Sequence, residues 1–188
     1  MQTFEARTIQ FRLVTPEDTE FIHSLRVDPR KNQHLSPTTG GVEVQRTWLE
    51  SYKRREADEA EFYYVIETND RASCGVVRLY DFQGPCFCWG SWILGGRAPR
   101  KAAIESAMLV YEIGFGPLGF TKSHFDVRRA NERVWKFHER MGATRVCETD
   151  LDYFYRYPCA DYSRVRPGLE EFLGNKGPLF DGQQINRD

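Results

Sequence analysis

The sequence NERVWKFHERMGA, residues 131–143, is the strongest structural signal in this chain of 188 residues. Asn131 is a good N-cap, because its side-chain oxygen can accept a hydrogen bond from the free amides of a first helical turn. Gly142 suits the left-handed conformation that closes a helix. Apolar side chains recur at helical spacing from Val134, and His138 lies on the same face four residues later. The stretch therefore predicts a short, well-delimited helix with a histidine that points inward.

The segments before and after this helix alternate between strand and helix patterns, separated by Gly, Pro and Asn turns. We predict strands over residues 8–15, 61–68, 73–82, 87–94, 123–129, 144–149 and 152–157, and further helices over residues 16–27, 42–57 and 99–115. In the helix at 42–57, we expect Val44, Trp48 and Tyr52 to form the inward ridge. This order predicts an α+β fold with a mostly antiparallel sheet and helices on its faces. The length fits one domain over residues 1–172, followed by a polar tail over residues 173–188.

Composition excludes several classes of function. The formal net charge is −1 and no basic field is present, which argues against nucleic-acid binding. The first residues lack the apolar run of a signal peptide, and no stretch approaches the length of a membrane helix, so we expect a cytoplasmic protein without a membrane partner. The five cysteines fit reduced thiols. Cys86 and Cys88 share a strand face, but no second pair follows at a suitable spacing, so we expect no metal site.

The extended segment ending at Asn131, the inward position 138 and the closing Gly142 resemble the last helix of the GNAT superfamily of acetyl-CoA-dependent N-acetyltransferases. The resemblance extends over roughly residues 8–157. It implies a GNAT acyltransferase fold, with a mixed central sheet in an α/β/α arrangement, and acetyl-CoA as cosubstrate. It also implies that His138 takes the place of a family tyrosine beside the CoA sulfur, where a proton donor assists departure of the thiolate. Asn131 is expected in the cofactor site.

A second segment, WGSWILGGRAPRKAA at residues 89–103, matches the cofactor-binding part of the same pattern. In the family, the central strand offers its backbone to the pantetheine and the following turn and helix hold the pyrophosphate, since free helix amides favour anions. The resemblance implies cofactor binding by Trp92, Ile93, Leu94, Arg97, Arg100, Lys101, Ala102 and Ala103. The usual glycines of the turn are replaced here, and the three cations can offset part of their loss through contacts to phosphate.

The proton chemistry differs from the family pattern at two positions. An unperturbed histidine with a pKa near ~6.5 is mostly neutral at pH 7.5, but its neutral tautomer still donates a hydrogen bond. Many relatives carry a glutamate just before the glycine of the central strand, whereas this chain has Cys88-Trp89-Gly90. Asp81 and His34 are the candidates for a base. A weak base favours acceptor amines less basic than lysine.

Three functions agree with these observations. The first is acetylation of a small-molecule amine, in particular the amino group of a nucleotide-linked amino sugar. The second is acetylation of a ribosomal-protein or other N-terminal α-amine. The third is a non-catalytic acyl-CoA-binding regulatory module. An acidic acceptor groove would favour peptides, whereas an aromatic and cationic lining would favour a sugar nucleotide. A homodimer is left open by the sequence.

Overall fold

The computed structural model describes residues 3–34, 40–174 and 179, and its centre is one sheet of eight strands. The strands are β1 (Phe4–Glu5), β2 (Ile9–Leu13), β3 (Phe62–Thr68), β4 (Ser73–Gln83), β5 (Cys86–Leu94), β6 (Lys122–Arg128), β7 (Thr144–Glu148) and β8 (Asp152–Pro158). Their order in the sheet is β1-β2-β3-β4-β5-β6-β8-β7. Every neighbouring pair is antiparallel except β5 and β6, which are parallel. The sheet is thus mixed and mostly antiparallel, as predicted.

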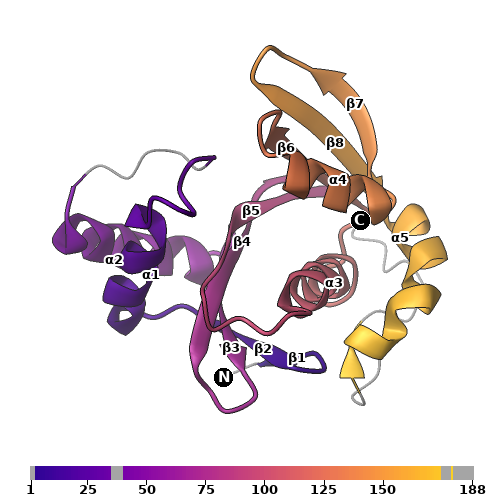
Figure 1. Ribbon diagram of the computed structural model, residues 1–188. Helices are drawn as coiled ribbons and strands as arrows, with labels where there is room; N and C mark the ends of the chain where they lie inside the picture. Colours follow the sequence, from indigo (N-terminus) through magenta and orange to yellow (C-terminus); the bar gives the residue numbers. More distant parts are fainter. Residues whose placement is uncertain (1–2, 35–39, 175–178, 180–188) are drawn as a thin grey trace.

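Helices cover both faces of this sheet (Figure 1). They are α1 (Thr19–Val27), α2 (Val42–Ala57), α3 (Ala102–Phe115), α4 (Glu132–Arg140) and α5 (Cys159–Val165), with short 3-10 helices at Pro16–Asp18 and Arg166–Phe172. The first two helices lie on one face, and α3 and α5 lie on the other. The α+β architecture expected from the sequence is confirmed. No helix in the described part of the chain is both long and apolar enough to span a membrane.

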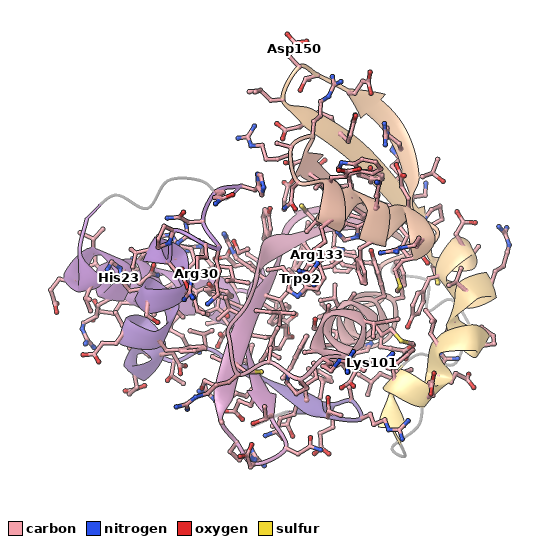
Figure 2. The ribbon with its side chains drawn as sticks, in the orientation of Figure 1. His23, Arg30, Trp92, Lys101, Arg133 and Asp150 are labelled. Atoms are coloured by element: carbon pink, nitrogen blue, oxygen red, sulfur yellow. The ribbon has the colours of Figure 1, made fainter. Side chains whose placement is uncertain are left out.

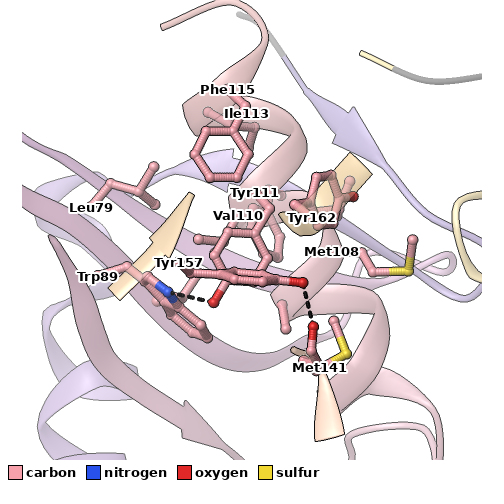
Figure 3. Packing of buried hydrophobic residues seen from close by; sticks show 14 of the residues in the cluster. Leu79, Trp89, Met108, Val110, Tyr111, Ile113, Phe115, Met141, Tyr157 and Tyr162 are labelled. Carbon is pink, nitrogen blue, oxygen red and sulfur yellow. Dashed lines mark hydrogen bonds between the residues drawn. The ribbon is translucent and has the colours of Figure 1, made fainter. Parts of the chain in front are cut away.

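Two apolar clusters hold these layers together. The smaller one joins α1 and α2 to the sheet through side chains such as Ile22, Leu49 and Val65. The larger one surrounds α3, whose residues are almost all buried because the helix lies between the sheet and the C-terminal helices. One hydrogen bond inside this cluster joins β5 to α3. Trp89 Nε1 donates a hydrogen bond to the Tyr111 hydroxyl over 3.3 Å (Figure 3).

The parallel pairing of β5 and β6 is short, and this positions the site. Three residue pairs are in register, the last of them Cys88 with His124. On its other edge β5 bulges against β4, because Val76 pairs with Ile93 while Arg78 pairs with Gly90. A bulge inserts an extra residue and bends its strand. The two strands therefore separate beyond Cys88.

Ser91, inside the bulge, has a φ of 48°. This left-handed conformation is uncommon for a residue other than glycine and is often found at functional sites. The strand thus carries local backbone strain where it leaves β6.

The structure corrects several expectations about the elements. Sequence patterns did not reveal β1, α5 or the 3-10 helix Arg166–Phe172. The helix expected from residue 99 begins at Ala102, because the Ala102 amide bonds to the Pro99 carbonyl in a tighter turn first. Val44 was expected to face inward but is 56% exposed. The buried residues of α2 are Gln45, Leu49 and Tyr52, and Trp48 packs against the smaller cluster, so the prediction holds for Trp48 and Tyr52.

The C-terminal segment is described only in part. Phe172 and Leu173 are buried against the large cluster. Most of the tail predicted over residues 173–188 lies outside the described residues, so the boundary at 172 stays a prediction.

Candidate active site

A cavity of about 230 Å³ lies where β5 and β6 separate. Its walls come from β4, β5, β6, α1, α4 and the segment after α1. Aromatic side chains form part of the wall: Tyr80, Trp89, Trp92 and Phe125. The ionisable and amide side chains in the wall are Arg26, His34, Asp126, Arg128, Asn131 and His138. The structure therefore brings together Trp92, Asn131, His34 and His138, which were predicted from separate parts of the sequence.

His138 is on α4 and is 4% exposed, so the predicted inward histidine is present. Its ring lies among aromatic rings, with centroids 4.3 Å from Phe125 and 5.2 Å from Trp89. Within the described part of the chain, its buried Nδ1 has no hydrogen-bond partner. Burial in this apolar surrounding lowers the pKa of His138 to about 3. The side chain is therefore a neutral imidazole at physiological pH and donates only through its neutral tautomer.

Asn131 precedes α4 at the N-cap position, but its side chain makes no capping hydrogen bond. The expectation of a side-chain cap is wrong. The Asn131 carbonyl accepts from the amides of Val134 and Trp135 in the first turn, while the side chain lines the cavity. The other end of the helix is closed as predicted, by Gly142 with a φ of 94°. The asparagine side-chain amide is thus left available to a ligand.

Asp126 is the carboxylate of the cavity wall, and sequence reasoning missed it. Phe125 and Val127 are buried in the α3 cluster, so strand alternation directs Asp126 to the opposite face. Partial desolvation, with a smaller contribution from the nearby Asp152 carboxylate, raises the pKa of Asp126 above its ordinary value. A carboxylate with a raised pKa is a better proton acceptor. Polar and apolar residues alternate along β6, and a carboxylate at one of the polar positions was the signal that could have identified Asp126.

The two bases proposed from the sequence lie in different places. His34 lines the cavity. Asp81 is not part of the cavity wall. It is exposed and accepts hydrogen bonds from Gln83, and it lies 3.0 Å from Nε2 of His124. These contacts lower the pKa of Asp81, which makes it a weaker base than Asp126.

The segment expected to bind the cofactor has a free backbone edge and free amides. Beyond Cys88 the β6-facing edge of β5 has no partner strand among the described residues, so the backbone of Trp92 to Leu94 is available there. The side chain of Ile93 is buried in the α1–α2 cluster, and Leu94 packs against the other cluster. These two residues can therefore contribute through the main chain.

The start of α3 follows this edge. The Ala102 amide is taken by Pro99, but the amides of Ala103 and Ile104 have no partner in the described part of the chain. Free amides at a helix start favour an anion. Arg97, Arg100 and Lys101 are exposed beside them. This donor set fits a pyrophosphate group.

Trp92 connects the two parts of the site. Its indole Nε1 donates to Ser106 Oγ on α3 over 3.0 Å, and its ring contacts Phe137 and His138. Figure 2 shows Trp92 between the sheet and α3, and Lys101 at α3. Of the residues predicted to hold the cofactor, Trp92 and Asn131 line the cavity, whereas Arg97 lines a separate hollow beside α1.

A larger hollow of about 700 Å³ lies elsewhere, beside β1, β2 and the β3–β4 turn. Its wall is polar and of mixed charge, with Arg7 and Glu171 forming an ion pair of 3.7 Å. None of the residues predicted for the site is in this wall. The smaller cavity is therefore the candidate active site because of the residues in its wall and in spite of its size.

Comparisons with known proteins identify the family and support the fold. A family model described as an acetyltransferase (GNAT) domain matches residues 8–144. Among solved structures, apo FdhC, described as a nucleotide-linked sugar GNAT, has 42% sequence identity and a TM-score of 0.86, covering 92% of this chain and 99% of its own. A search of curated proteins found no match.

Two more distant structures share the fold. A ribosomal-protein-S5-alanine acetyltransferase from Vibrio fischeri has 15% identity and a TM-score of 0.71, covering 84% of this chain and 97% of its own. A spermidine N-acetyltransferase from Vibrio cholerae, in complex with CoA and spermine, has 16% identity and a TM-score of 0.72, covering 83% of this chain and 98% of its own. At these identities the likeness extends to the fold alone.

Proposed function

The chain belongs to the GNAT family of acetyltransferases, and on that premise we propose that it transfers an acetyl group from acetyl-CoA to the amine of a nucleotide-linked amino sugar. The observation that carries the choice of acceptor is the lining of the cavity. It combines four aromatic side chains with Arg26, Arg128 and His34, against the single carboxylate of Asp126. Aromatic faces suit a sugar ring or a base, and the two arginines suit a diphosphate.

A polyamine or a peptide amine would meet a less suitable wall. Such acceptors carry positive charge, and their sites need several carboxylates to hold it. Here one carboxylate faces two arginines, although Arg128 also forms a 2.8 Å ion pair with Asp152. The similarity to FdhC, described as a nucleotide-linked sugar GNAT, supports the same choice.

One side chain of the cavity must remove a proton from the acceptor amine. A protonated amine has no free electron pair, so the acceptor must lose a proton before it attacks. Asp126, with its raised pKa, takes that proton on the β6 side of the cavity. His34, across the cavity, is the alternative proton acceptor. Acetyl-CoA, when bound, supplies the activated acyl group.

His138 acts at the other side of the reacting centre. Its neutral ring holds an N–H that stabilises negative charge on the departing sulfur by a hydrogen bond. A thiolate with a pKa near ~8.5 leaves without full protonation, so an imidazolium is not required. The side-chain amide of Asn131 orients the cofactor next to it. Aromatic rings around His138 exclude water from this part of the site.

The test is release of CoA thiol from acetyl-CoA with a panel of amines. The panel contains a nucleotide-linked amino sugar, the same amino sugar without its nucleotide, spermidine, and a peptide with N-terminal alanine. We expect the nucleotide-linked sugar to have the highest kcat/KM, by about a hundredfold, because two or three charge-assisted contacts are each worth ~1.5–3 kcal/mol. Faster release with the peptide would favour an α-amine acetyltransferase.

Binding without turnover would separate the third function from the first two. At a hundredfold excess of CoA over Kd, a working cofactor site stabilises the fold by about 2.7 kcal/mol. Clear stabilisation with no thiol release from any amine would indicate an acyl-CoA-binding module. A cytoplasmic location remains a prediction, and the oligomeric state stays open.

A further inference from the structure

A second group of reactive side chains lies outside the cavity, where β4, β5 and β6 meet. The Sγ atom of Cys86 is 3.1 Å from Nδ1 of His124, and Nε2 of the same ring is 3.0 Å from Oδ2 of Asp81. A thiol, an imidazole and a carboxylate are therefore connected in series. The two ring nitrogens face different partners, so the arrangement cannot hold one metal ion through all three side chains.

The backbone places Asp81 in this series. Tyr80 pairs with Cys88 while Gln83 pairs with Cys86, so β4 has an extra residue and bulges at this point. Asp81 has a φ of 51° there, a left-handed conformation that is uncommon outside glycine. The Gln83 side-chain amide donates to both carboxylate oxygens of Asp81 at 2.9 Å. The bulge and the amide together fix the carboxylate against the imidazole.

The carboxylate decides which ring nitrogen carries the proton. Hydrogen bonds from Gln83 and His124 lower the pKa of Asp81, so it is ionised and only accepts. The Nε2 atom of a neutral His124 ring is therefore the donor, and Nδ1 has its lone pair directed to the Cys86 sulfur. An imidazole oriented in this way is a general base for a thiol.

We propose that Cys86, His124 and Asp81 form a base-activated thiol, at which α,β-unsaturated carbonyl compounds and similar soft carbon electrophiles attach covalently. The Cys86 sulfur adds to the β-carbon of the electrophile as its proton moves to Nδ1 of His124. The carbon–carbon double bond opens, and the α-carbon takes the proton back from His124. No leaving group, oxidant or reductant is needed.

The surroundings of the thiol make the base necessary. Partial burial raises the pKa of Cys86, and the cations Arg156 and Lys122 offset this only in part. The acids that face the group are Asp81 from β4 and Asp126 from β6. A field of cations alone thus does not produce a thiolate here, and the reaction depends on proton transfer to His124.

The other cysteines provide internal references. All five are free, and Cys74, Cys88 and Cys159 are buried, whereas Cys147 is exposed on β7. Cys86 is half-buried. If access alone controlled labelling, Cys147 would react first. If the base controls it, Cys86 reacts first despite its lower exposure.

The experiment measures the rate of N-ethylmaleimide attachment to each cysteine of the full chain at pH 7, by peptide mass spectrometry. We expect Cys86 to react about tenfold faster than Cys147, and His124→Gln to slow Cys86 by about tenfold with Cys147 unchanged. Asp81→Asn should also slow the labelling of Cys86. Lys122→Gln, which removes a neighbouring cation but leaves the relay, should change the rate by less than about threefold.

Two results would overturn the proposal. One is a Cys86 rate at or below that of Cys147 in the unmodified protein, which needs no variant. The other is an unchanged Cys86 rate in His124→Gln while Cys74 and Cys159 stay unlabelled, since their protection shows that the variant is folded. If Cys74 becomes labelled in the variant, the ratio of the Cys86 rate to the Cys147 rate in the unmodified protein decides whether the proposal stands.

Discussion

Replacing His138 tests the role of the neutral imidazole. Three variants separate volume from hydrogen bonding: His138→Phe fills the space without a donor, His138→Tyr restores a donor, and His138→Ala removes both. The ring is 4% exposed and packs against Phe125 and Trp89, so His138→Ala leaves a cavity. We expect that variant to lose about 2–4 kcal/mol of unfolding free energy, and His138→Phe to lose about 1–2 kcal/mol.

The expected effect on turnover follows from the pKa. With a pKa of about 3, roughly one His138 ring in 10⁴ is protonated at pH 7. Donation must therefore come from the neutral N–H. We expect His138→Phe to lower kcat by about 10²-fold, within the ~10²–10⁴-fold range of acid–base groups, with little change in KM for acetyl-CoA. His138→Tyr should retain kcat within about tenfold.

The assay is the pH dependence of kcat by thiol release, together with acid unfolding. The imidazole stays neutral in the fold down to about pH 3, so kcat should show no ionisation of His138 between pH 5 and 9. The unfolded chain takes up the proton near pH 6.5. Unfolding free energy should therefore fall between pH 6.5 and 3, by at most on the order of 5 kcal/mol at 1.36 kcal/mol per pH unit, and His138→Phe should lack this loss.

Two results would refute this reasoning about His138. Full kcat in His138→Phe would show that no hydrogen bond from this position is needed. A fall in kcat above about pH 6.5 that disappears in His138→Tyr would show that the imidazolium is the active form.

The remaining predictions concern the base, the cofactor and the core. Asp126→Asn should lower kcat/KM by about 10²-fold, and it should remove the loss of activity that we expect as pH falls through the raised pKa of this carboxyl; pH profiles of both proteins check this. The double variant Arg100→Ala, Lys101→Ala should weaken CoA binding by about tenfold, measured by calorimetry, with binding of a pantetheine thioester that lacks the nucleotide unchanged. Gly114→Ala should lower the unfolding free energy by about 1–3 kcal/mol in denaturant, because its Cβ would lie 2.3 Å from the Phe87 ring.

Much of the fold was predictable because periodicity and turn residues report burial directly. The helix after Asn131 was found, and so was its buried histidine, since the apolar face and closing glycine are local signals. On the inward face of α2, Tyr52 is buried and Trp48 packs against the smaller cluster as predicted, but Val44 does not face inward. Val44 is exposed and the polar Gln45 is buried, so hydropathy favoured the wrong residue in the first turn of this helix.

The candidate site was less predictable, because its geometry depends on the separation of two strands. In the sequence, Asp126 looks like an ordinary acid within a strand. Only the structure shows that it lines a cavity near the bulge at Ser91. The sequence predicted a side-chain cap at Asn131, but only the backbone carbonyl of this residue accepts hydrogen bonds from the first turn of α4. The contact between Asp81 and His124 could not be predicted, because these two residues are far apart in the sequence.

We propose that acyl transfer takes place in the cavity between β5 and β6. The most direct measurement is the rate of thiol release from acetyl-CoA with a nucleotide-linked amino sugar, for the unmodified protein, Asp126→Asn and His138→Phe, with stabilisation by CoA measured in parallel. We predict turnover by the unmodified protein, about 10²-fold slower release by each variant, and CoA stabilisation retained in all three. Equal rates in all three proteins, or no release by the unmodified protein despite CoA binding, would contradict the claim.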